Sequence, residues 1–242
     1  MTKQYPTLES ITKNFANFAI KHIGETFWLA RAKQRQVAAK YLEKLETIIV
    51  RMSNQERIKL KDKFDRIIPK QAGGWIYRYD DRFLDLVIEI LGFGYLIKKK
   101  YDPSFTTTPD IVGYKKGIKV AAMECKNFWM SQCERDYLRS TMESVDNIKG
   151  RRVDATLTLP EFRNPFYRKL ISVIDKATSH LSQLNENVKE RIIFINFSFD
   201  VGAGLQREKI INDILKPEAN RLRSCGITCI WFENYSLERI LV

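Results

Sequence analysis

The segment PDIVGYKKGIKVAAMECK, residues 109–126, is the strongest indication of the fold of this chain. It contains two short runs rich in apolar residues, Asp110 to Tyr114 and Ile118 to Lys126, with the tight turn Lys115-Lys116-Gly117 between them. Short apolar runs separated by a glycine-containing turn are typical of β-hairpins. The stretch therefore predicts two antiparallel strands.

Three charged residues of this stretch are expected to meet. Asp110 opens the first strand, whereas Glu124 and Lys126 close the second. Because strand side chains alternate, Glu124 and Lys126 point to one face, and a hairpin brings Asp110 close to both. Glu124 also ends an apolar strand, where a charge is costly unless it is paired or bound to metal. Two converging carboxylates suit Mg²⁺, and a neighbouring lysine can hold water or stabilise charge on a phosphate, so the pattern favours phosphodiester hydrolysis.

Outward from the hairpin, hydrophobic periodicity predicts alternating helices and strands. A helix is expected over Asp81–Leu91, closed by Gly92-Phe93-Gly94, with a short strand beginning at Tyr95-Leu96-Ile97. The resulting order from Asp81, α-β-β-β-α-β-α-β, predicts an α/β sandwich with a mixed central sheet. The elements expected after the hairpin are a possible helix over 134–148, a loop over 150–160, a long helix over 166–184, a strand over 191–198, a helix over 210–222 and a strand over 227–232.

The N-terminal region, residues 1–75, is predicted to be helical and basic. Ser53 and Glu56 form a capping-box pattern for its third helix, which is expected to run to about Ile68. Pro69 and the sequence at 71–74 then predict a hinge before a second domain over 76–242. A basic stripe on the second helix either lies on a phosphate backbone, as part of a DNA-contacting or dimerising region, or is a solvated face. The stripe consists of Lys33, Lys40, Lys44 and Arg51.

The composition of the chain favours a polyanion as its binding partner. The 242 residues carry a formal charge of +12, and residues 1–75 hold 15 Lys and Arg against 7 Asp and Glu. A basic surplus favours nucleic acid, because neutralised phosphates release counterions, although lysine also serves for solubility. With 44% hydrophobic residues a packed core is expected rather than wholesale disorder.

Several classes of protein lose support. The chain has no run of about 18 apolar residues to cross a membrane and no apolar segment typical of a secretory signal near its start. Its four cysteines indicate reduced thiols and a cytoplasmic location, and Cys225-x₃-Cys229 lacks a second pair of zinc ligands. The two histidines, His22 and His180, are far apart, and neither a GxSxG elbow nor a P-loop occurs.

The order of elements and the pattern Pro109-Asp110…Glu124-Cys125-Lys126 resemble the PD-(D/E)xK nuclease superfamily, which includes restriction endonucleases and archaeal Holliday-junction resolvases. The resemblance covers about residues 80–233 and implies a restriction-endonuclease-like αβββαβ core. It implies that Asp110, Glu124 and the main-chain carbonyl of Cys125 bind Mg²⁺, for which Mn²⁺ can substitute, and that Lys126 assists the nucleophile. It also implies DNA as the substrate and a homodimer, since cutting two strands needs two sites related by a two-fold axis.

One position departs from that pattern. Members of the superfamily often carry a glutamate early in the helix before the first core strand, where this chain has Leu84. Asp81, Asp85 and Glu89 are spaced by four residues along one helix edge. Of these, Asp85 is our choice for an auxiliary catalytic carboxylate; otherwise the three form a solvated edge.

Several further residues are candidates for a functional role, and most of them have two interpretations. Phe128-Trp129 either stacks on an unpaired base or packs under the sheet. Lys176 and Gln183 either face the cleft or are simply exposed, and His180 is expected to be structural or exposed. Gly202-Ala203-Gly204 is explained by a turn. A set of basic residues within 127–163 forms either a phosphate-contacting loop or an ordinary exposed one: Arg135, Arg139, Lys149, Arg151 and Arg152.

The favoured function is a metal-dependent DNA endonuclease, for which a restriction site, a branched junction, a flap or RNA would use the same site residues. The alternative is a catalytically weak or inactive nuclease-fold protein that acts as a nucleic-acid-binding or assembly module, which Leu84 at the glutamate position motivates. A third possibility is a structural α/β protein in which Lys126 and Glu124 form an ion pair.

Overall fold

The computed structural model describes residues 5–23, 36–68, 76–128, 163–184, 188–197, 211–233 and 239–240, and these form a mixed α/β structure. The helices are α1 (Pro6–Ile23), α3 (Gln36–Val50), α4 (Asn54–Arg66), α5 (Ile76–Lys98), α7 (Arg163–Ser182), and the π-helical turn η3 (Ile211–Leu215) leading into α9 (Lys216–Ser224). The strands are β1 (Asp102–Phe105), β2 (Ile111–Lys115), β3 (Ile118–Phe128), β4 (Glu190–Phe197), β5 (Ile227–Glu233) and β6 (Arg239–Ile240).

Within the described residues the strands form one mixed sheet in the order β1-β2-β3-β4-β5-β6. The strands β1, β2 and β3 pair antiparallel, whereas β3, β4 and β5 pair parallel and β6 returns antiparallel. Parallel neighbours need long crossover connections, and α7 and α9 lie in these connections. The predicted α/β class with a mixed central sheet is confirmed, and the described elements from α5 to β5 follow the order α-β-β-β-α-β-α-β.

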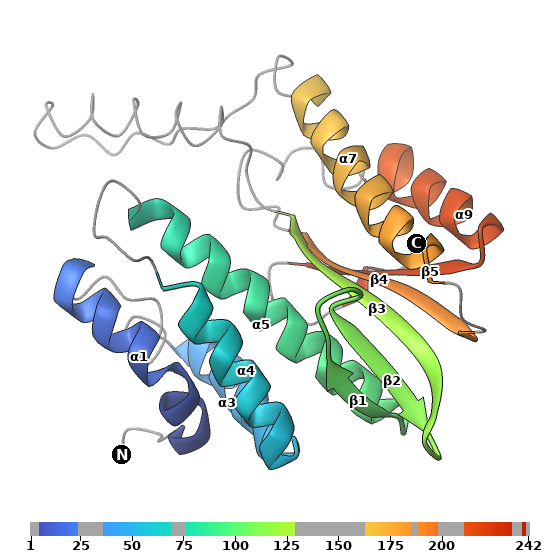
Figure 1. Ribbon diagram of the computed structural model, residues 1–242. Helices are drawn as coiled ribbons and strands as arrows, with labels where there is room; N and C mark the ends of the chain where they lie inside the picture. The colour runs from blue at the N-terminus through green and yellow to red at the C-terminus, as the bar shows by residue number, and fades with distance from the viewer. Residues whose placement is uncertain are drawn as a thin grey trace, which may run out of the picture.

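Helices cover both faces of the sheet (Figure 1). On one face lies α5, with α1, α3 and α4 beyond it, and on the other lie α7 and α9. Alternation along β3 produces the two faces: Met123 and Cys125 belong to the core under α5, whereas Ala122 and Phe128 belong to the core under α7. The end of β3 therefore lies between two helical layers.

The N-terminal helices share a core with α5. Phe15 from α1 stacks on Phe83 from α5 at 5.2 Å between ring centroids, and Phe64 from α4 lies 5.5 Å from Phe83. All three side chains are fully buried. In the described part of the chain, α1, α3 and α4 therefore form a helical layer packed directly on α5.

The start of α4 confirms half of the predicted capping box. The Ser53 side chain accepts a hydrogen bond from the backbone N–H of Glu56 at 3.2 Å. The carboxylate of Glu56 instead accepts from the backbone N–H of Phe105 in β1 at 2.8 Å and from Lys59 at 2.7 Å. Glu56 therefore ties α4 to the first strand of the sheet.

The predicted end of the helix at Gly92-Phe93-Gly94, and the strand at 95–97, are wrong. Helix α5 continues without a break to Lys98, and the first strand is β1, at 102–105. A Cβ on Gly94 would lie 2.5 Å from Cδ1 of Ile48 in α3, and one on Gly92 would lie 2.7 Å from Sδ of Met123 in β3. The two glycines let α3 and the sheet approach the helix closely, and they do not end it.

Several sequence predictions lie outside the described residues. They are the hinge at 69–74, the helix at 134–148, the loop at 150–160, Trp129, Gly202-Ala203-Gly204, Lys33 and the basic residues between 135 and 152. Of the predicted basic stripe, Lys44 in α3 and Arg51 directly after it are exposed, and the side chain of Lys40 lies outside the described part. No helix among the described residues is both long and apolar enough to span a bilayer.

Candidate active site

The β2–β3 hairpin forms as predicted and sets the positions of the charged residues. Its turn has Lys116 and Gly117 at φ values of 53° and 76°, the left-handed pair that a two-residue type I′ turn requires. At the other end Ile111 pairs with Met123, so one further step along this register places Asp110 opposite Glu124. The backbone N–H of Thr106 donates to the carbonyl of Asp110 at 3.0 Å and holds the start of β2.

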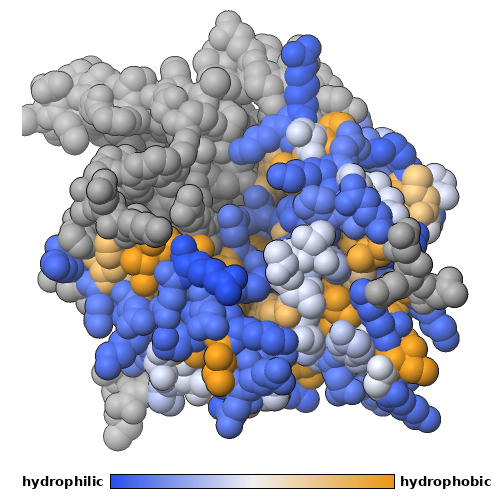
Figure 2. Space-filling view, in the orientation of Figure 1, coloured by the Kyte–Doolittle hydropathy of each residue, from blue (hydrophilic) through white to orange (hydrophobic). Residues whose placement is uncertain are grey.

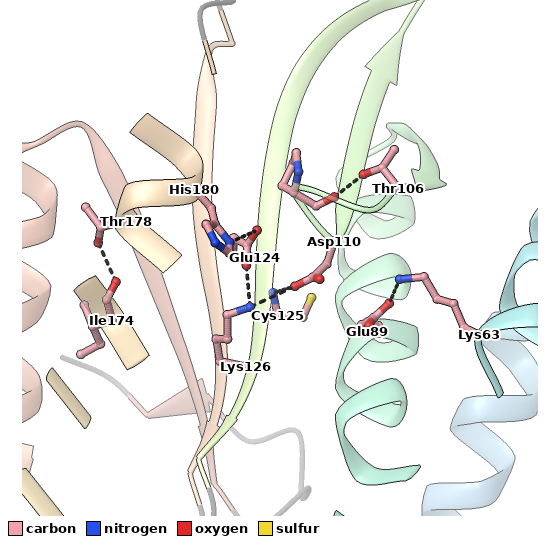
Figure 3. A network of polar contacts seen from close by, with 11 residues as sticks. Lys63, Glu89, Thr106, Asp110, Glu124, Cys125, Lys126, Ile174, Thr178 and His180 are labelled. Carbon is pink, nitrogen blue, oxygen red and sulfur yellow. Dashed lines mark hydrogen bonds and ion pairs between the residues drawn. The ribbon is translucent and has the colours of Figure 1, made fainter. Parts of the chain in front are cut away.

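The structure brings Asp110, Glu124 and Lys126 together (Figure 3). Lys126 Nζ lies 2.5 Å from Oε2 of Glu124 and 3.4 Å from Oδ2 of Asp110. The same Asp110 oxygen accepts a hydrogen bond from the backbone N–H of Cys125 at 2.8 Å. One lysine thus joins the two carboxylates that the sequence pattern selects.

The electrostatics of this group favour a charged lysine. Glu124 is almost completely buried, with 1% of its surface exposed, and two carboxylates facing each other across strands repel. Burial alone would lower the pKa of Lys126, but Asp110 and the hydrogen bond to Glu124 outweigh it and hold that pKa above its usual value. The ammonium therefore stays protonated at neutral pH and offsets the repulsion.

His180 in α7 also contacts the group, a partner that the sequence analysis does not identify. Its Nδ1 lies 3.2 Å from Oε1 of Glu124, so Lys126 and His180 each contact a different oxygen of that carboxylate. A carboxylate accepts only, so Nδ1 carries the proton, and in the neutral ring Nε2 is left as an acceptor. In the sequence, a role for His180 is indicated only by its position beside the apolar stripe of α7, which includes the buried residues Ala177 and Leu181.

Among the acids on α5, Glu89 makes an ion pair with a neighbouring helix, and Asp85 as an auxiliary carboxylate stays a prediction. Glu89 Oε2 lies 2.5 Å from Nζ of Lys63 in α4, whereas Asp85 is exposed and the side chain of Asp81 lies outside the described part. Burial raises the pKa of Glu89 to about 7; Lys63 opposes this shift, and the negative charge of Asp110 adds to it. The charge of Glu89 is therefore linked to that of Asp110.

Burial decides the state of two other side chains at the end of β3. The Cys125 thiol is buried on the α5 side, and burial raises its pKa well above the usual value, so it remains a neutral thiol. Its main-chain carbonyl as a ligand stays a prediction. Phe128 is 2% exposed and packs in the core under α7, with Nζ of Lys169 at 5.4 Å from the ring centroid. The interpretation that a base stacks on Phe128 is therefore wrong, and the interpretation that its ring packs under the sheet is confirmed.

The donor set is suited to a hard cation. Asp110 and Glu124 offer carboxylate oxygens, and Mg²⁺ commonly binds through one or two carboxylates while keeping several waters. Over the described residues, no group of three or more His, Cys, Asp and Glu side chains stands together as a metal cluster. A cation on both carboxylates would compete with Lys126 for Oε2 of Glu124.

Glu89 should make folding stability pH-dependent. Its pKa of about 7 lies above the usual 4.5, so the folded state binds more protons than the unfolded state between these values, and stability falls as pH rises through them. Wild type should lose up to about 3 kcal/mol of unfolding free energy relative to Glu89→Gln between pH 4.5 and 7.5. Urea unfolding of both proteins in EDTA measures this difference, and parallel pH profiles would contradict it.

Comparisons with known proteins assign no family to this chain. It matches no family model, no curated protein and no solved structure. Its function is therefore inferred from its own residues.

Proposed function

We propose that this chain is a metal-dependent endonuclease that hydrolyses phosphodiester bonds in DNA. The observation that carries the proposal is the convergence of Asp110, Glu124 and Lys126 at one end of the β2–β3 hairpin. The order α5-β1-β2-β3-α7-β4 around it supports a restriction-endonuclease-like core, which is part of the proposal.

Each residue of the group has a role in this reaction. Asp110 and Glu124 would hold Mg²⁺, which supplies an activated water and charge neutralisation when bound. Lys126 orients the attacking water and stabilises negative charge on the phosphate. His180 fixes the Glu124 carboxylate from the α7 side at 3.2 Å, and on the α5 side the charge of Glu89 interacts with that of Asp110.

Charge supports a nucleic acid as substrate. The chain carries a formal charge of +12, and Figure 2 shows a face covered mainly by hydrophilic residues, with hydrophobic ones in scattered groups. A net positive charge attracts the phosphate backbone and raises association rates. A homodimer is also part of the proposal, since two sites would cut both strands of a duplex or a branched junction.

A second function has an observation in its favour. Lys126 already contacts both carboxylates, which is the arrangement of a structural ion pair. A nuclease-fold module that only binds nucleic acid would keep this pair and show salt-sensitive DNA binding without cleavage. Metal-dependent cutting separates the two functions.

DNA cleavage should require both the carboxylate of Asp110 and the ammonium of Lys126. Asp110→Asn and Lys126→Met keep side-chain size and remove one charge each, so we expect at least about 100-fold slower cutting in each variant. The assay follows supercoiled plasmid, linear duplex, a four-way junction and RNA with Mg²⁺, Mn²⁺ or EDTA.

The matched controls are Asp102→Asn and Lys115→Met, two exposed residues toward the turn end of the β1–β2–β3 unit. They should cut like wild type. Activity that survives in Lys126→Met, or that persists in EDTA, would contradict the proposed site.

His180 is expected to act as a positioning residue for Glu124. An asparagine amide can donate to Oε1 much as Nδ1 of His180 does, so His180→Asn should keep most activity, whereas His180→Ala should lose about 10–100-fold. The Mg²⁺ concentration for half-maximal rate should rise in His180→Ala and recover in His180→Asn. Equal losses in both variants, or none in His180→Ala, would refute the positioning role.

A further inference from the structure

One edge of α7 presents a row of nitrogen-bearing side chains beside the site. Lys169, Lys176 and His180 fall within about 40° of one another around the helix axis at about 100° per residue. Buried residues such as Ile174 and Ala177 lie to one side of this row and pack on the sheet. The row therefore follows the border between the buried face of α7 and solvent.

Both ends of the row are anchored on β3. His180 contacts Glu124, and the ammonium of Lys169 lies over the ring of Phe128. Since β3 runs from Glu124 to Phe128 while α7 runs from Lys169 to His180, the helix is antiparallel to the end of the strand (Figure 1). The row thus leads from the buried carboxylate along the end of β3 that carries Lys126.

Lys176 is the exposed member of the row. Within the described residues it makes no ion pair, and the single acid described on α7, Asp175, pairs with Arg221 at 2.8 Å. Asp175 lies about 100° around the helix from Lys176. The edge beside the site is therefore positive.

We propose that Lys176 and Lys169 form a track for the phosphodiester backbone of the DNA strand that enters the Asp110–Glu124–Lys126 group. This inference rests on the proposed function and adds the path of the substrate strand. Lys176 is four residues from His180, a rise of about 6 Å, and Lys169 is about 10 Å further. Lysine ammonium groups contact phosphates as point charges, which gives affinity and register without reading sequence.

The test is DNA binding measured without cleavage. Fluorescence anisotropy with a labelled duplex in EDTA compares wild type with Lys176→Ala, an exposed position where truncation leaves the core untouched. Affinity should fall roughly 3–10-fold near 0.15 M salt, and the slope of log affinity against log salt should shrink by about 0.9.

The matched control is Arg168→Ala on the same helix. Arg168 is exposed, carries the same charge and lies about 80° around the helix from Lys176. It should bind DNA like wild type with an unchanged salt slope. If cleavage is present, Arg168→Ala should also cut DNA at the wild-type rate, because Arg168 lies outside the proposed track.

The outcomes separate this inference from the nuclease proposal. A specific loss of DNA affinity in Lys176→Ala with no cleavage by any version supports the track and overturns the nuclease. Cleavage lost in Asp110→Asn, with Lys176→Ala and Arg168→Ala binding alike, supports the nuclease and overturns the track. Binding to RNA but not to DNA overturns the track as a DNA surface.

Discussion

The Lys126 ammonium between the carboxylates of Asp110 and Glu124 is the interaction on which the candidate site depends. The hairpin register places two acids opposite each other, and one of them is almost fully buried. Leaving that pair uncompensated would cost several kcal/mol in repulsion and lost hydration. Lys126 offsets this cost from two residues along the same strand face. The same negative potential that keeps Lys126 protonated would also attract a divalent cation, so the ion pair and a metal site share one physical cause.

The two helical layers supply the contacts that hold this group in place. From one side, His180 of α7 contacts the second oxygen of Glu124. From the other, Glu89 of α5 is close enough for the charge of Asp110 to raise its pKa, and Lys63 of α4 pairs with it. The N-terminal helices therefore reach the site through Lys63 as well as through the shared core. A change in the packing of α4 on α5 would alter the charge beside Asp110.

Local patterns were enough to predict the hairpin, because period-two alternation and turn chemistry act between neighbouring residues. They failed for the end of α5, where Gly92 and Gly94 are required by contacts with α3 and β3 that no local pattern encodes. His180 escaped prediction for the same reason, since its partner Glu124 lies 56 residues away. Along the helix edge of the three acids, the packing of α4 on α5 decides which one is covered: Glu89 pairs with Lys63, whereas Asp85 is exposed.

Mn²⁺ binding followed by electron paramagnetic resonance tests the central claim most directly, because it detects the metal without needing the right substrate. The experiment titrates wild type, Asp110→Asn and Glu124→Gln under identical conditions. If the two carboxylates form a metal site, wild type binds Mn²⁺ and each variant loses at least about tenfold in affinity. Undiminished binding in both variants, or no binding to wild type, would contradict the site.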